Sequence, residues 1–71
     1  MNYALDTNII SYILRTATLI YSKRKKQGRP IEDTDLLIAA QCVTNGYTLV
    51  TNNMRHFDNI DGLSAVNWKE Q

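Results

Sequence analysis

The sequence has few of the features of a secreted or membrane-bound chain. It contains one cysteine, Cys42, so no disulfide can form within the chain. No apolar run approaches the roughly 20 residues that a membrane span needs. The N-terminus also lacks the basic segment followed by an apolar segment that is typical of a signal peptide. We therefore expect no membrane contact and a location in the reducing cytoplasm, where a free thiol is stable.

Glycine and proline are scarce too, with three residues and one residue, and no linker, repeat or low-complexity segment divides the chain. Residues 1–71 are therefore interpreted as a single domain. The hydrophobic share of 44% is typical of a folded protein rather than a disordered tail. A core of this size is only marginally stable without a disulfide, a metal or a second subunit, so oligomerisation is expected.

Net charge is also small, since 8 basic residues face 7 acidic ones. This balance argues against a protein that is basic over its whole surface, as many nucleic-acid binders are. Much of the positive charge is concentrated in one stretch, formed by Lys23, Arg24, Lys25, Lys26 and Arg29. Any salt-sensitive contact with RNA phosphates is predicted there, although such a run is most often a solvated helix end.

The first half of the chain predicts one strand and two helices. Residues 2–6 form a short apolar run that ends at Asp6, as a buried strand would. Apolar residues then recur at helical spacing, which predicts one unbroken helix over residues 8–26. Gly28 and Pro30 supply its stop signal. A second helix is predicted from about Thr34 to Thr44, with acidic residues in its first turn.

The second half predicts two more strands. Residues 47–51 are rich in residues that favour strands, and residues 65–68 make a plausible final strand, with Trp68 as a core anchor. Met54 to Phe57 can form one helical turn between them. Because helical segments and not tight hairpin turns separate the strands, the pattern predicts an α/β fold with a parallel sheet.

Carboxylates at two element ends suggest a metal site. Asp6 ends a strand, Asp35 opens a helix, and Thr51 and Asn53 lie at the end of another strand. In open parallel α/β sheets ligands bind outside the carboxyl ends of the strands, so these groups can converge on one crevice. Mg²⁺ and Mn²⁺ prefer oxygen ligands and need only one or two carboxylates beside water and phosphate.

Ordinary structural roles compete with this interpretation. An aspartate that ends a strand or starts a helix is more often a turn or capping residue than a metal ligand. Asn52 and Asn53 are a common turn pair, and His56 is more readily explained as a surface residue. Spacing alone therefore does not establish a site.

Three motifs nevertheless resemble the PIN-domain proteins of the VapC toxin type. The start Leu5-Asp6-Thr7-Asn8 is similar to the LDTN opening of PIN domains. Asp35 with Ile38-Ala39-Ala40 looks like the D-x-x-IAA helix start of VapC toxins, and residues 49–53 resemble the last strand and turn of the domain. The resemblance covers nearly the whole chain apart from about residues 16 to 20.

The resemblance implies roles for individual residues. Asp6 and Asp35 correspond to metal-binding carboxylates, Asn53 stands where relatives have an aspartate or asparagine in the catalytic site, and Thr51 is a substrate or neighbouring group. PIN nucleases also have a glutamate after their second strand, whereas this sequence has no glutamate between Asp6 and Glu32. We therefore expect a weak Mg²⁺ or Mn²⁺ site. Glu32 or Asp33 is a minor candidate for a replacement ligand.

A missing central segment follows from the same comparison. The fold expected is a truncated PIN-like three-layer fold with about three parallel strands per chain, completed by dimerisation or by exchange of elements between two copies. The function expected is a Mg²⁺- or Mn²⁺-dependent endoribonuclease of toxin–antitoxin type, attenuated or inactive, with RNA as substrate. The alternative is a non-catalytic module that forms a homodimer or binds a VapB-type antitoxin. A phosphatase-like domain ranks lower, because Asn8 replaces the second aspartate such sites use.

Overall fold

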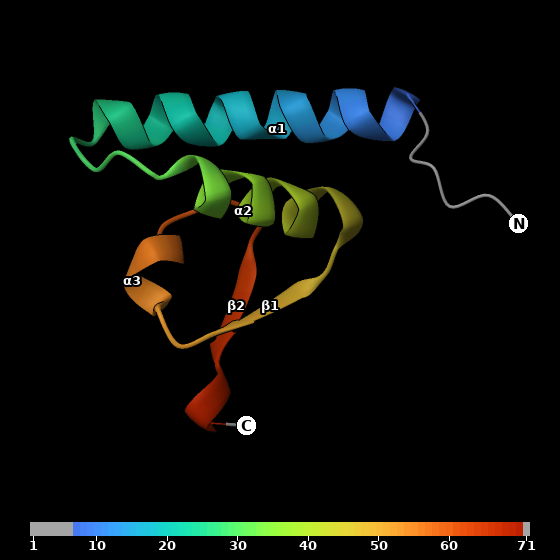
Figure 1. Cartoon of the computed structure of the whole chain (residues 1–71). Helices are drawn as coiled ribbons and strands as arrows, with labels where there is room; N and C mark the ends of the chain where they lie inside the picture. Colours follow the sequence, from blue (N-terminus) through green and yellow to red (C-terminus); the bar gives the residue numbers. More distant parts are fainter. Residues whose placement is uncertain (1–6, 71) are drawn as a thin grey trace, which may run out of the picture.

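The computed structural model describes residues 7–70, so Asp6 and the strand predicted for residues 2–6 lie outside the described part. The elements follow the order α1 (Thr7–Lys26), α2 (Asp33–Asn45), β1 (Thr48–Thr51), α3 (Met54–Phe57), β2 (Ser64–Asn67) and η1 (Trp68–Glu70), a short 3-10 helix. Figure 1 shows α1 lying across α2, with the two strands on the other side of α2. The prediction of an α/β fold is confirmed.

Helix α1 is a single rod of 20 residues, close to 30 Å at 1.5 Å per residue. The predicted helix over residues 8–26 is therefore confirmed, with no break at its middle. Its buried residues repeat at spacings of four, three and four, the period of one helical face, and they are Ile13, Ala17, Ile20 and Arg24. The last of these is charged, so the buried stripe of α1 ends in a guanidinium group.

Helix α2 begins and ends as the sequence predicts. Asp33 and Asp35 lie in its first turn, where carboxylates interact favourably with the helix dipole. It ends at Gly46, whose φ of 69° is left-handed and therefore suits glycine. Ala39 and Ala40 in its centre are completely buried. These small side chains let the helix pack closely between α1 and the rest of the core.

Strands β1 and β2 are parallel, with Val50 opposite Val66. Side chains alternate between the two faces, so Leu49 and Ala65 are half-buried while Val50 and Val66 are 52% and 37% exposed. Parallel sheets are normally covered on both faces. Within residues 7–70, the face that carries the two valines is uncovered.

The core joins α1, α2 and the segment that connects the strands. Its buried apolar residues are Ile13, Ala17, Ile20, Ile31, Ala39, Ala40, Phe57 and Ile60. The prediction that Trp68 anchors the core is wrong, because this side chain is 51% exposed in η1, beyond the end of β2. Cys42 is half-buried. None of the helices over residues 7–70 is both long and apolar enough to span a membrane.

Candidate functional site

Asp35 contacts a side chain from another part of the chain. It is the third residue of α2, and its side chain is 19% exposed. Its Oδ2 lies 3.1 Å from Nδ1 of His56 in α3, a hydrogen bond when that nitrogen carries a proton and an ion pair when the imidazole is charged. No side chain caps the start of α2. The capping role that competes with a ligand role for Asp35 is therefore not observed.

A cavity of about 170 Å³ lies beside this pair. Its walls come from the end of α1, the loop before α2, the first turn of α2 and helix α3. The lining residues are Arg24, Arg29, Pro30, Ile31, Glu32, Asp35, Arg55 and His56. Three arginines and one histidine thus surround two carboxylates, and we call this the Asp35 cavity. An anionic group and a cation can both find partners in it.

Arg24 ties α1 to the segment after α3. Its side chain is only 5% exposed, and Nη2 donates a hydrogen bond of 2.5 Å to the carbonyl oxygen of His56. Nη1 lies 3.5 Å from Oδ1 of Asp58, which also accepts a hydrogen bond of 2.6 Å from Arg29 Nη2. Arg24 was predicted to bind substrate with the surrounding lysines. The structure instead directs its guanidinium into the protein, because the residue continues the buried stripe of α1.

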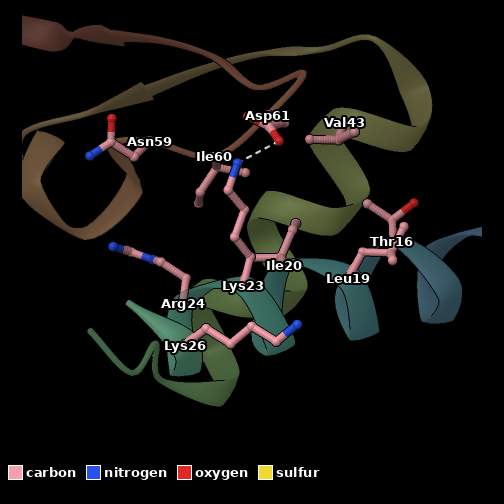
Figure 2. Close-up of a pocket in the computed structure, with 10 residues that line it drawn as sticks. All are labelled: Thr16, Leu19, Ile20, Lys23, Arg24, Lys26, Val43, Asn59, Ile60 and Asp61. Carbon is pink, nitrogen blue, oxygen red and sulfur yellow. Dashed lines mark hydrogen bonds and ion pairs between the residues drawn. The ribbon is translucent and has the colours of Figure 1, made fainter. Parts of the chain in front are cut away.

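The lysines around Arg24 remain at the surface. Figure 2 shows Lys23 reaching from α1 to Asp61, and the two charged atoms are 2.6 Å apart. Lys26 leaves the helix in a different direction from Arg24 (Figure 2). Lys25 is exposed, with Nζ 6.0 Å from the ring centre of Tyr21. Lys25 and Lys26 are therefore the members of the predicted basic run that the structure leaves most accessible.

The second cavity, drawn in Figure 2, has a different character. It has a volume of about 480 Å³ and lies between α1, the end of α2 and the loop that leads to β2. Apolar side chains from Leu19, Ile20, Val43 and Ile60 form much of its wall. Its charged lining residues are Lys23, Arg24 and Lys26 on α1 and Asp61 in the loop before β2. Arg24 lines both cavities, but Asp35 lines only the smaller one, so the larger cavity does not include the candidate metal ligand.

Thr51 and Asn53 form a turn at the carboxyl end of β1. The backbone N–H of Asn53 donates a hydrogen bond of 3.0 Å to Oγ1 of Thr51. Neither residue lines the Asp35 cavity, and no hydrogen bond within residues 7–70 joins either of them to Asp35. Of the predicted site residues, the structure brings Asp35 and Arg24 to one cavity and leaves these two at a neighbouring turn.

The carboxylate oxygens at the cavity supply only the minimum number of ligands that a Mg²⁺ or Mn²⁺ ion needs from a protein. Asp35 offers carboxylate oxygens at the cavity wall, and Glu32 lies close in sequence at the same cavity. Across residues 7–70, however, no group of three histidine, cysteine, aspartate or glutamate side chains could hold a metal. An ion held by Asp35 would therefore need further oxygen ligands, such as water and phosphate oxygens.

Three residues of the Asp35 cavity did not emerge from the sequence as site residues. His56 was interpreted as a surface residue, and its side chain is indeed 53% exposed, but it contacts Asp35. Arg55 was assigned no role, and Arg29 was predicted only as a member of the basic run that would contact RNA phosphates. The available signal was the concentration of basic residues on both sides of the second helix, at residues 23–29 and again at 55–56. The two groups meet only in the folded protein, where Arg24 and Arg29 donate hydrogen bonds to the carbonyl oxygens of His56 and Arg55.

Solved structures with a similar fold define the class. A VapBC2 complex of Rickettsia felis, bound to a DNA fragment from its promoter, matches with a TM-score of 0.71 and 30% identity over 89% of this chain and 44% of that chain. VapBC-1 of nontypeable Haemophilus influenzae matches with a TM-score of 0.69 and 30% identity over 93% of this chain and 46% of that one. The fold is that of a PIN domain, with a short parallel sheet.

Sequence relatives identify the family more closely. The tRNA(fMet)-specific endonuclease VapC of Shigella flexneri is 33% identical over 64 residues, which cover 86% of this chain and 48% of the relative. Ribonuclease VapC2 of Haemophilus influenzae is 39% identical over 49 residues, 69% of this chain and 37% of that protein. No family model matches the chain. These relatives and the solved structures support a fragment of a VapC-type PIN-domain protein, and the chain spans about half the length of the Shigella relative.

Proposed function

We propose that this chain is an endoribonuclease of VapC type, with a reduced metal site and weak activity. The observation that carries the proposal is the position of Asp35, whose carboxylate faces a cavity that also contains Arg29, Arg55 and His56. A carboxylate can hold a metal ion, and guanidinium groups bind phosphate. Two of the similar proteins are named as a tRNA endonuclease and a ribonuclease, which supports the same class of reaction.

Asp6 and Asp35 would hold the Mg²⁺ or Mn²⁺ ion in this proposal. When bound, such an ion orients the phosphate, lowers the pKa of an attacking water and offsets the negative charge that develops during hydrolysis. With no glutamate between Asp6 and Glu32, the site has one carboxylate fewer than the family pattern. We therefore expect weak affinity for the ion.

The protein's own groups have simpler tasks. His56 fixes one oxygen of Asp35 and so leaves the other oxygen in a defined direction. Thr51 and Asn53, at the end of β1, are proposed to contact RNA beside the cavity. Lys25 and Lys26 are exposed and would attract the RNA backbone over a distance of about one Debye length, roughly 8 Å at physiological salt.

Cleavage of a fluorescent single-stranded oligoribonucleotide tests this proposal. We expect slow cleavage with Mn²⁺ and none with EDTA, and at least a tenfold lower rate for Asp35→Asn because a ligand charge is lost. Asp33→Asn is the matched control: the sequence left Asp33 as a minor ligand candidate, but it lines the cavity between α1 and α2 and not the Asp35 cavity, although it lies in the same helical turn as Asp35. If both variants cleave like the parent chain, or if the parent fails to cleave with Mn²⁺, the proposal is wrong.

A non-catalytic binding module is the second candidate, and a separate surface favours it. An apolar cavity of about 420 Å³ lies between α1 and α2, and its wall includes Leu14, Tyr21 and Leu37, which are 57%, 44% and 48% exposed. Such side chains are typical of surfaces that another chain covers. Because the similar solved structures are VapBC complexes, a VapB-type antitoxin is the proposed partner, and a second copy of this chain is the alternative. Antitoxin binding by a chain without cleavage activity would favour this candidate.

A further inference from the structure

We propose that Arg29 and Arg55 form a binding site for one phosphodiester group of single-stranded RNA, at the Asp35 cavity. The inference rests on the proposed ribonuclease function and adds the residues that hold its substrate. The two arginines come from different segments, the loop before α2 and helix α3, and both line the cavity. A backbone phosphate placed between them would lie beside Asp35.

Arg55 has an available guanidinium group. The residue is exposed, and its side chain makes no hydrogen bond or ion pair with any residue in the part of the chain that the structure describes. Its backbone carbonyl accepts a hydrogen bond from Arg29 Nη2 at 3.4 Å, which connects the two residues. Because no side-chain interaction of Arg55 within residues 7–70 would be broken, the guanidinium group can bind an anion there without losing a described partner. This side chain is therefore suited to a ligand and not to the stability of the fold.

Arg29 is held in place for the same task. It is half-buried, and Nη2 donates hydrogen bonds to Asp58 Oδ1 at 2.6 Å and to the Arg55 carbonyl at 3.4 Å. No hydrogen bond or ion pair within residues 7–70 uses its Nε or Nη1, so each of these two nitrogens keeps a donor, one on either side of the occupied Nη2. A fork whose direction is already fixed loses little conformational freedom when it binds phosphate.

Buried charge at the back of the cavity also favours an anion. Arg24 is nearly fully buried, and its Nε has no hydrogen-bond partner among residues 7–70. Asp58 alone is shared between Arg24 and Arg29, so one carboxylate balances two guanidinium groups there. The carboxylates of Asp35 and Glu32, which also line the cavity, repel a phosphate. The phosphate is thus expected on the arginine side of the cavity.

The size of the cavity agrees with this ligand. Its volume of about 170 Å³ is several times the ~30 Å³ that a water molecule occupies in the liquid, so a group larger than water can enter. By comparison, the basic run on α1 leaves fewer side chains available to hold a phosphate in one position. Lys23 is already paired with Asp61, and Arg24 is turned inward. Lys25 and Lys26 add general attraction, whereas the two arginines define a position.

Binding of a fluorescent single-stranded oligoribonucleotide in EDTA, without divalent ions, tests the inference independently of cleavage. We expect Arg55→Gln to weaken binding about tenfold, as the loss of one charge-assisted contact does. It should also reduce the slope of log affinity against log salt by about 0.7, the value for one phosphate of a single strand. Arg55→Lys keeps the charge but not the fork, so it should recover part of the affinity.

Arg15→Gln is the control, because Arg15 is an exposed arginine on α1, remote from the cavity, with its guanidinium 5.9 Å from the ring centre of Tyr12. It should lower affinity by less than twofold. Equal losses in Arg15→Gln and Arg55→Gln, an unchanged affinity in Arg55→Gln, or no measurable binding by the parent chain would overturn the inference. A selective loss in Arg55→Gln in a chain that cleaves nothing with Mn²⁺ would support the phosphate site and contradict the ribonuclease.

Discussion

At the scale of single residues, Asp58 holds together the part of the molecule that forms the Asp35 cavity. It pairs with Arg24 from α1 and with Arg29 from the loop before α2, at 3.5 and 2.6 Å. Arg24 is buried, so its positive charge is stabilised by this carboxylate and by the carbonyl oxygen of His56. A buried charge without a partner is costly. Asp58 therefore contributes to stability although it is itself 45% exposed.

We expect Asp58→Ala to lower the free energy of unfolding by about 1–2 kcal/mol, less than the loss of a fully buried pair because Asp58 is partly solvated. Urea unfolding followed by circular dichroism measures this change. Asp61→Ala is the control, since it removes a salt bridge of similar length whose aspartate is 83% exposed. That change should cost less than about 0.5 kcal/mol. Equal effects of the two substitutions would contradict the role given to Asp58.

Residue identity alone could not predict where Arg24 lies. It stands within four consecutive basic residues, which together look like a solvated helix end. The helical period gives a different answer, because Arg24 follows Ile13, Ala17 and Ile20 on one face. Trp68 is the opposite case: its apolar ring predicted burial, but β2 ends at Asn67, and no element among those described covers the ring. Periodicity was informative for α1, and composition was misleading for the C-terminal segment.

At the scale of elements, the helices could be predicted because their apolar periodicity and their end signals agree. Helix α1 ends near Gly28, with φ of 70°, and α2 ends at Gly46, as the glycines predict. The sheet was harder to predict, because two strands of four residues give little pattern. Sequence alone also did not reveal the uncovered face of the sheet, since exposure depends on which helices pack where. That face motivates a prediction about assembly.

We expect the protein to form a homodimer that covers the face with Val50 and Val66. Light scattering at micromolar concentration should then give about twice the 8.1 kDa mass of the chain. Val50→Lys should shift the mass toward the monomer, because a charge would be buried in the interface. Gln41→Lys, at an exposed position of α2, should leave the mass unchanged. A parent chain that is folded and monomeric under these conditions would refute the expectation.

At the scale of the whole molecule, the candidate site is assembled from segments that are distant in the sequence. The resemblance to VapC proteins pointed to Asp35, and the structure places it at a cavity. The partner of Asp35, His56, comes from α3, about twenty residues further along, and Arg24 at the end of α1 lines the same cavity. No local pattern connects these segments. Their proximity follows from α1, α2 and α3 packing around one core that includes Ala39 and Phe57.

We propose that Asp35, with Asp6, holds one divalent ion in a chain that spans about half the length of its Shigella relative. Titration calorimetry with Mn²⁺ tests it most directly. We expect a single weak site in the parent chain, with a Kd near the millimolar range because the ligand set is small, and no measurable binding by Asp35→Asn. Asp33→Asn should bind Mn²⁺ like the parent. If Asp35→Asn binds Mn²⁺ as tightly as the parent chain does, Asp35 is not a ligand and the claim is contradicted.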